Sequence, residues 1–154
     1  MAYLKLCDVT KSFGSGLAKV DVLNGVSMEV GKGEMCTVLG QSGSGKSTLL
    51  NIIGGLDSLD GGKIIVDGTD ISAYDSEELS AYRRANLGFV FRFYNLVPNL
   101  TVLENIQVGE YLLDSPLNME EIVSVLGLSE LKNRFPQELS GRQQQRCSIG
   151  RALI

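Results

Sequence analysis

The spacing of apolar residues along the chain predicts strands in its first part and helices toward its end. Residues 3–13 and 20–30 show the loose alternation of half-buried strands, and an Asn-Gly pair interrupts the second segment as a turn or bulge does. Residues 63–66 form a third short strand before an Asp-Gly turn. The apolar runs at 35–39 and 87–91 are predicted to be fully buried strands of a parallel sheet.

Helices are predicted where apolar residues recur every three or four positions. In the first helix Leu49, Leu50, Ile52 and Ile53 make one apolar face, and a Gly-Gly pair ends the helix. Asp75 or Ser76 is predicted to cap the second helix, and Thr101 with Glu104 is predicted to form a capping box at the start of the third. The predicted helices cover residues 47–55, 75–84, 102–108, 119–128 and 140–154. Strands followed by helices in this order indicate an α/β chain with a helical second part.

Length and composition limit the classes of function. The chain has 154 residues, which is enough for one domain with a hydrophobic core. Its formal net charge of −4 argues against non-specific binding to nucleic acid, which needs many Lys and Arg side chains. The absence of histidine excludes His-based catalytic triads and most zinc sites. Three widely separated cysteines are typical of reduced thiols in a cytosolic protein.

Neither a signal peptide nor a membrane-spanning segment is predicted. The first ten residues lack a basic stretch followed by a long apolar run. Apolar runs stay well short of the roughly 20 residues that a transmembrane helix needs. We therefore expect the protein to serve any membrane process through a partner.

The strongest chemical signal lies at residues 40–47. They read GQSGSGKS, which fits the P-loop pattern G-x-x-x-x-G-K-[ST]. The glycines let the backbone present successive N–H groups to phosphate oxygens, and Lys46 places a positive charge beside the β- and γ-phosphates. Ser47 offers a hydroxyl to Mg²⁺, and the following helix directs its positive end at the same anion. A purely structural glycine turn is the alternative, but the predicted strand and helix around the motif favour phosphate binding.

Four stretches together resemble the nucleotide-binding domain of ATP-binding cassette (ABC) transporters. They read KSFGSG, GQSGSGKSTLLNIIGGLDSLDGGKIIVDG, GFVFRFYNLVPNLTVLENI and LSGRQQQRCSIGRAL, so the resemblance runs from about residue 3 to the last residue. The third stretch is most similar to the subgroup that exports macrolides or peptides, releases lipoproteins or acts in cell division. The resemblance implies an α/β fold, with a P-loop NTPase-type core and antiparallel β subdomain in residues 1–92 and a helical subdomain in 93–154.

The resemblance also implies a function and its partners. The chain would be a cytoplasmic subunit, peripheral to the inner face of the cell membrane, that couples ATP binding and hydrolysis to transport through a membrane permease. Phe13 would stack on adenine, Ser47 would bind Mg²⁺, and a second nucleotide-binding domain would pair head to tail. The residues implied to bind ATP are Phe13, Gly40, Gln41, Ser42, Gly43, Ser44, Gly45, Lys46, Ser47 and Thr48. The signature residues implied to reach the partner's ATP are Leu139, Ser140, Gly141, Arg142 and Gln143.

Two residues depart from the family pattern. Arg92 stands where the family has the Q-loop glutamine, and a guanidinium has no acceptor atom for Mg²⁺. Arg142 replaces the second glycine of LSGGQ, so we expect impaired closure of the dimer. The family continues after this helix with further strands, a Walker B aspartate, a catalytic glutamate and a switch histidine. The 154 residues are therefore expected to lack these C-terminal strands and to bind ATP without efficient hydrolysis.

Two other interpretations stay open. The chain could be a truncated, non-catalytic nucleotide-binding fragment, or a module that docks to a permease through residues 94–106 without using nucleotide. Nucleotide binding that depends on Lys46 would separate these two. The arginines of the last helix, Arg142, Arg146 and Arg151, are interpreted as a solvated helix face.

Overall fold

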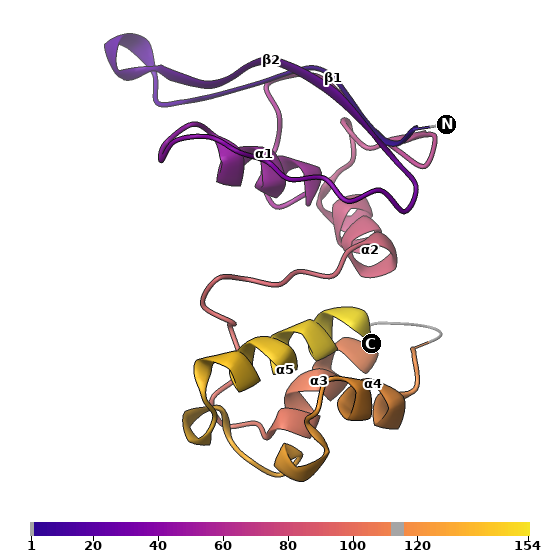
Figure 1. Cartoon of the computed structure of the whole chain (residues 1–154). Helices are drawn as coiled ribbons and strands as arrows, with labels where there is room; N and C mark the ends of the chain where they lie inside the picture. Colours follow the sequence, from indigo (N-terminus) through magenta and orange to yellow (C-terminus); the bar gives the residue numbers. More distant parts are fainter. Residues whose placement is uncertain (1, 112–115) are drawn as a thin grey trace. The chain divides into compact units, whose positions relative to one another are not determined.

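The computed structural model describes residues 2–111 and 116–154, in two compact units. The first unit ends at Arg83 and the second begins at Arg84. Figure 1 shows strands and helices in the first unit and helices in the second. This confirms the predicted α/β fold with an antiparallel β part and a helical part. The sequence predicted a subdomain boundary near residue 92, a few residues after the division between these two units. That subdomain boundary stays a prediction.

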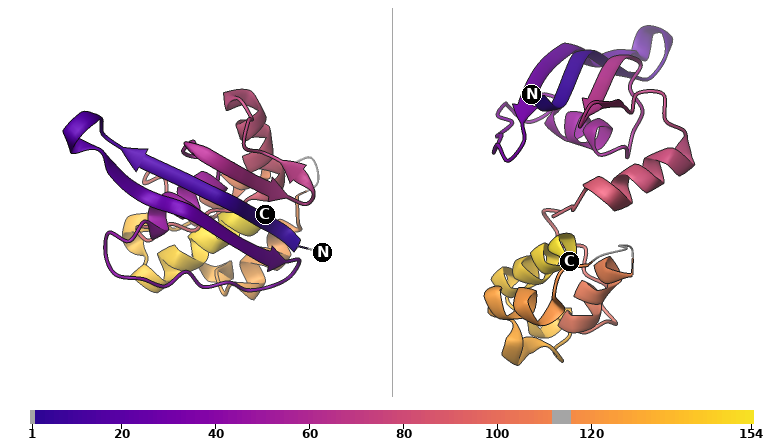
Figure 2. Two further views of the ribbon diagram at one scale, coloured as in Figure 1. Left: turned by 90° about the horizontal axis from the view of Figure 1, so that it is seen from above. Right: turned by 90° about the vertical axis from the view of Figure 1, so that its right-hand side faces the viewer.

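An antiparallel sheet forms the framework of the first unit. Its strands are β1 (Ala2–Phe13), β2 (Val20–Gly31), β3 (Gly61–Val66) and β4 (Thr69–Asp70), in the order β2-β1-β3-β4. The 3-10 helix η1 (Gly16–Ala18) connects β1 to β2. In Figures 1 and 2 helix α1 (Lys46–Ile53) lies along one face of β1 and β2.

The core of the first unit is built from the sheet and α1. Buried apolar side chains come from the strands at Leu6, Val9, Leu23, Ile64 and Val66, and from α1 at Leu49 and Ile52. Leu50, which was predicted to share this face, is 53% exposed. The reason is helical geometry, since residues three apart share a face while the next residue is turned about 100° away.

The predicted interruption of β2 is a β-bulge. Val26 pairs with Val9, but Leu23 pairs with Lys11, so β2 holds one more residue than β1 between these pairs. Gly25 adopts a φ of 72° at this point, a left-handed conformation that residues with a side chain disfavour. The Asn-Gly signal in the sequence is thereby confirmed as a bulge rather than a turn between two strands.

Helix α2 (Ser76–Asn86) follows the sheet along the chain. Asp75 caps it as predicted, because its Oδ1 accepts a hydrogen bond from the backbone N–H of Glu78 at 2.9 Å. The buried Tyr82 donates its hydroxyl to the carbonyl of Ile53 at 3.0 Å. This bond fastens α2 to the last turn of α1.

Two predicted strands do not form. Residues 35–39 and 87–91 pair with none of the described strands. Met35 is 95% exposed and Phe91 is 41% exposed, so neither segment is buried. An apolar run becomes a buried parallel strand only where neighbouring strands supply hydrogen bonds on both sides. The sheet uses other segments, and the prediction of two parallel strands is wrong for this structure.

Helices and 3-10 turns make up the second unit. They are α3 (Val102–Glu110), α4 (Met119–Val125), η2 (Ser129–Leu131), η3 (Pro136–Glu138) and α5 (Gly141–Leu153). Their buried side chains form one apolar cluster of Val102, Ile106, Ile122, Val123, Leu128, Leu139, Cys147 and Ile154. The sequence pattern predicted all three α-helices, and the structure confirms them within a few residues at each end.

The predicted capping box at the start of α3 is present. Thr101 Oγ1 accepts from the backbone N–H of Glu104 at 3.3 Å, and Glu104 Oε2 accepts from the backbone N–H of Thr101 at 2.8 Å. The Thr101 hydroxyl also donates to Glu104 Oε2 at 2.8 Å, and the bonds from the Thr101 backbone and hydroxyl hold the pKa of the Glu104 carboxyl below its ordinary value. Two orphan N–H groups of the helix start are thereby satisfied.

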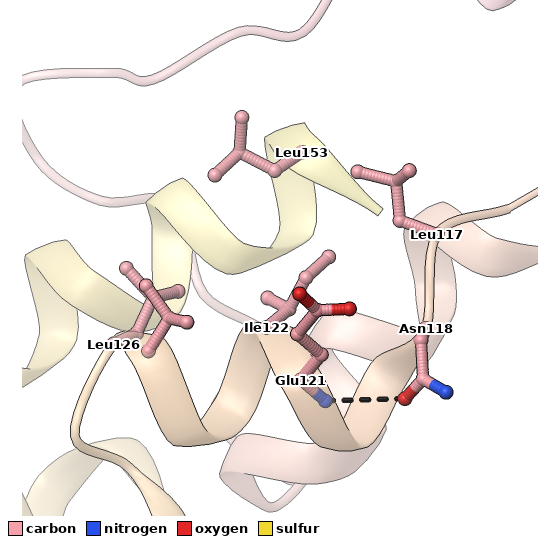
Figure 3. Close-up of a pocket in the computed structure, with 7 residues that line it drawn as sticks. Leu117, Asn118, Glu121, Ile122, Leu126 and Leu153 are labelled. Carbon is pink, nitrogen blue, oxygen red and sulfur yellow. Dashed lines mark hydrogen bonds between the residues drawn. The ribbon is translucent and has the colours of Figure 1, made fainter.

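A small apolar cavity of about 230 Å³ lies between α4 and the end of α5 (Figure 3). Leu117, Ile122 and Leu153 line it, and at its edge Asn118 Oδ1 accepts from the backbone N–H of Glu121 at 3.1 Å. The residues predicted to bind nucleotide are absent from its lining. The cavity is therefore not part of the predicted nucleotide-binding site.

Asn105 fastens the segment before α3. Its side chain is fully buried, and Oδ1 accepts from the backbone N–H of Val97 at 2.7 Å. Its Nδ2 donates to the carbonyls of Val97, Leu100 and Thr101 at 3.1, 2.9 and 3.0 Å. One amide side chain thus closes the turns of residues 97–101.

Replacing Asn105 with Ala should lower the free energy of unfolding by about 2–4 kcal/mol, because these bonds disappear and buried polar groups lose their partner. Urea denaturation measures the change. The matched control is Asn133→Ala, at an exposed position, which should change the free energy by less than about 0.5 kcal/mol. Equal losses in the two variants would contradict the assigned role of Asn105.

The Cys147 thiol provides a pH-dependent test of the second unit's core. Burial raises its pKa from 9.0 to about 11, against a smaller opposing effect of Arg151. The unfolded chain then loses this proton at lower pH than the folded chain, so the stabilisation is complete below pH 9 and is lost as the pH rises toward 11. Urea denaturation across this range should show a steeper loss of stability for the wild type than for Cys147→Ala. Parallel pH profiles would show that the thiol ionises equally in both states.

Candidate nucleotide-binding site

The P-loop runs directly into helix α1. Gly45 is the N-cap of α1, with a φ of 83° in the left-handed region, and its carbonyl accepts the backbone N–H of Leu49 at 2.8 Å. A Cβ at Gly45 would lie 3.0 Å from the carbonyl oxygen of Val22 on β2. Both its backbone conformation and its packing therefore demand glycine. The junction fixes where the positive end of α1 begins.

Lys46 is folded back over the loop. Its ammonium donates to the carbonyls of Gly40 at 2.9 Å and Gln41 at 2.6 Å, and to Ser44 Oγ at 3.3 Å. The backbone N–H of Ser44 donates to the carbonyl of Gln41 at 3.2 Å, which closes a turn inside the loop. The structure thus brings the lysine together with three of the residues predicted to surround a phosphate chain.

The remaining predicted P-loop residues are open to solvent. Ser42, Gly43 and Ser47 are exposed, and Thr48 is half-buried in the first turn of α1. The first turn of a helix leaves N–H groups without intrahelical partners, and the helix dipole makes this end positive. The loop can therefore present backbone donors, one ammonium and a hydroxyl to an incoming anion.

Phe13 stands at the end of β1. It pairs with Val20 across the sheet, and 46% of its surface is exposed. The ammonium of Lys11 lies 5.3 Å from the centroid of its ring, within the range of a cation–π interaction. An exposed ring at a strand end can offer a stacking surface to a planar base.

Arg92 and the signature residues all lie in the second unit. Arg92 is exposed, and its guanidinium lies 5.8 Å from the centroid of the Phe93 ring. Leu139 is buried, whereas Ser140, Gly141 and Arg142 are exposed.

Ser140 is the N-cap of α5, which was predicted to begin at this residue, and it forms a capping box with Gln143. Ser140 Oγ accepts the backbone N–H of Gln143 at 3.4 Å and donates to Gln143 Oε1 at 2.9 Å. The exposed Arg142 follows within the first turn. The helix start is therefore positive in both its dipole and its side chain.

The interpretation of the α5 arginines as a solvated face is wrong for Arg151. Its guanidinium donates to the carbonyls of Asn95 at 2.7 Å and Tyr94 at 3.0 Å. These two residues have φ values of 47° and 61°, in the left-handed region. Arg146 donates more weakly to Leu126, at 3.4 Å. Sequence alone carries no signal for these pairings, because they join positions far apart in the chain.

A comparison of the sequence with known protein families identifies the family of this chain. The family model described as ABC transporter matches residues 23–154. The chain belongs to the ABC transporter family.

Curated ABC proteins are similar over almost the whole chain. The lipoprotein-releasing system ATP-binding protein LolD of Bacteroides thetaiotaomicron is 42% identical, over 98% of this chain and 70% of that protein. The bacitracin export ATP-binding protein BceA of Halalkalibacterium halodurans is 39% identical, over all of this chain and 63% of that protein. The macrolide export ATP-binding/permease protein MacB of Marinobacter nauticus is 43% identical, over 98% of this chain and 24% of that protein. The predicted subgroup is thereby confirmed.

A solved ABC structure has the same fold. A dimeric post-hydrolysis state of the ATP-binding cassette MJ0796, bound to ADP and Pi, matches with a TM-score of 0.86 and 37% identity. The match covers 97% of this chain and 68% of that chain. In the present ABC protein, the parts that the structure describes include no helix long and apolar enough to cross a membrane.

Two glycines of the ABC P-loop allow a matched test of its packing. Gly43 and Gly45 have φ values of 81° and 83°, but a Cβ at Gly43 would meet nothing within 4 Å. Gly43→Ala should therefore cost only backbone strain, about 1–2 kcal/mol, while Gly45→Ala should cost about 1–2 kcal/mol more through its contact with β2. Urea denaturation of both variants measures the difference. A larger loss for Gly43→Ala would refute the packing role of Gly45.

Proposed function

We propose that this ABC protein is the ATP-binding subunit of a transporter and acts through a membrane permease. The observation that carries the proposal is the P-loop geometry, in which Gly45 starts α1 and the Lys46 ammonium lies over the carbonyls of Gly40 and Gln41. The family match supports it, since similar proteins are named as ATP-binding proteins of lipoprotein-releasing and export systems.

Phosphate binding would exchange the partners of Lys46. A phosphate oxygen carries charge, so its hydrogen bond with the ammonium is stronger than those of the loop carbonyls. The backbone donors of residues 43–48 would hold the same phosphates. Gln41, Ser42 and Ser44 form the exposed turn that would surround them. Phe13 would receive the adenine ring.

The loop also fits a magnesium ion held mainly by the nucleotide. Mg²⁺ is commonly bound by one or two protein oxygens together with phosphates and water, and it neutralises phosphate charge when bound. Ser47, an exposed hydroxyl in the first turn of α1, would supply a protein oxygen. Among residues 2–111 and 116–154, no group of three or more His, Cys, Asp or Glu could hold a metal alone. Arg92 has no acceptor atom and would contribute to nucleotide binding only as a cation.

We propose a second nucleotide-binding domain as partner, arranged head to tail. The similar cassette MJ0796 was solved as a dimer with ADP and Pi. Leu139 to Gln143 would face the partner's nucleotide. The Ser140 hydroxyl donates to Gln143 Oε1, so contact with phosphate would have to replace this bond. Arg142 would bring bulk where the family has glycine, together with a charge that phosphate attracts.

The transported cargo would depend on the permease. Proteins named for lipoprotein release, bacitracin export and macrolide export are all similar in sequence to this one chain. The ATP-binding subunit would work at the cytoplasmic face of the membrane, held there by its permease partner. Residues 94–106 are our candidate docking segment.

Replacing Lys46 with Ala should weaken the binding of a fluorescent ATP analogue by about 10- to 100-fold, because hydrogen bonds from a charged donor contribute about 1.5–3 kcal/mol. Fluorescence titration of the purified chain measures the affinity. Lys32→Ala removes an exposed lysine from the turn after β2 and is the control with unchanged binding. If the analogue binds Lys46→Ala as tightly as the wild type, the P-loop is not the nucleotide site.

A further inference from the structure

Lys11 is a buried cation that the proposed function does not use. Only 8% of its surface is exposed, although it lies on β1 two residues before Phe13. Residues two apart on a strand project from the same face, which explains why its ammonium reaches the Phe13 ring. Its Nζ donates to Asp57 Oδ1 at 2.9 Å and to the carbonyl of Ser58 at 2.6 Å.

The partners of Lys11 belong to the connection that leaves α1. A buried ammonium is costly unless it is paired and hydrogen-bonded, and Asp57 and Ser58 supply both. A second carboxylate, Asp60, accepts from the backbone N–H and the hydroxyl of Ser12 at 2.7 and 2.6 Å. The Ser12 hydroxyl and backbone hold the pKa of Asp60 below its ordinary value. Residues 11 and 12, directly before Phe13, are therefore anchored to residues 57–60.

We propose that Lys11 is a positioning residue for the nucleotide base, acting through Phe13. The inference rests on the proposed function, in which Phe13 receives the base. The ammonium, 5.3 Å from the ring centroid, interacts with the Phe13 ring and restrains its rotation. Nearly half of the Phe13 surface stays open for stacking. A stacking surface held in place before binding loses less conformational freedom when the base arrives.

If Lys11 positions Phe13 for the base, its loss should affect the binding of ligands that carry a base and not of those that lack one. Inorganic tripolyphosphate offers the P-loop the same chain of phosphates as ATP but has no ring to stack on Phe13. Removal of the Lys11 charge should therefore weaken ATP and leave tripolyphosphate almost unchanged. A lysine that served only to stabilise the fold would affect both ligands equally.

The experiment is isothermal titration of the whole chain with ATP and with tripolyphosphate, each in Mg²⁺ buffer. Lys11→Met should weaken ATP binding by about three- to tenfold and tripolyphosphate binding by less than about twofold. Lys11→Arg keeps the cation and should restore most of the ATP affinity. Lys5→Met is the matched control, since Lys5 lies on the same strand in an exposed ion pair with Glu29, and both affinities should stay unchanged.

A double-mutant cycle tests whether Lys11 acts through the ring. Once Phe13 is replaced with Leu, the further change Lys11→Met should alter ATP affinity by less than about 1.5-fold. Additive effects of Lys11→Met and Phe13→Leu would overturn the proposal. Should Lys11→Met fail to fold by circular dichroism, Asp57→Asn weakens the anchor of the ammonium instead and should show the same preference for loss of ATP.

The remaining outcomes separate this inference from the proposed function. If the wild type binds neither ATP nor tripolyphosphate, the P-loop assignment fails and the role of Lys11 fails with it. If the wild type binds both and Lys11→Met weakens them equally, or weakens neither, the proposed function stands and the positioning role is overturned.

Discussion

The left-handed conformation of Gly45 is the constraint on which the candidate site depends. Within the P-loop it marks the start of α1, because its φ of 83° turns the chain directly into the first helical residue. Gly45 lies so close to β2 that a Cβ would be 3.0 Å from the carbonyl oxygen of Val22. Leu49 and Ile52 then bury the adjoining face of α1 in the core. The start of α1 is therefore packed against the sheet, while most of the loop before it is exposed.

A second set of contacts fixes the connection that follows α1. Lys11 and Ser12 at the end of β1 bind Asp57, Ser58 and Asp60 of the connection after α1. The sheet therefore fixes both ends of α1, through a backbone contact at its start and through charged groups beyond its end. A rigid element with both ends fastened is a better support for ligand contacts than a free loop.

The sequence was most predictive for features that depend only on residues close together in the chain. The cap at Asp75, the capping box of Thr101 with Glu104 and the bulge at Gly25 depend on residues within a few positions of each other. The P-loop pattern is also local, since its glycines and lysine lie within residues 40–47, and its role in nucleotide binding stays a prediction. Sequence failed for residues 35–39 and 87–91, since a buried strand depends on neighbours that the pattern of one segment does not contain.

It also missed the polar side chains that join distant segments. Lys11, Asn105 and Arg151 look like ordinary surface residues in the sequence, yet each binds a segment brought close only by the fold. In the second unit this has a structural consequence for the stretch that resembles the Q-loop. Asn105 on α3 holds its Val97, and Arg151 on α5 holds the carbonyls of Tyr94 and Asn95 in left-handed conformations.

A left-handed conformation costs a residue with a side chain about 1 kcal/mol or more, so it persists only where the surroundings impose it. Arg151 donates hydrogen bonds to the carbonyls of the two consecutive residues that adopt it, from the same helix whose N-terminal end carries Ser140 and Arg142. A Cβ at Gly141 would lie 3.1 Å from the hydroxyl of Tyr94, so the two stretches also pack at the start of that helix. The two stretches that depart from the family pattern are therefore parts of one packed assembly, joined through α5.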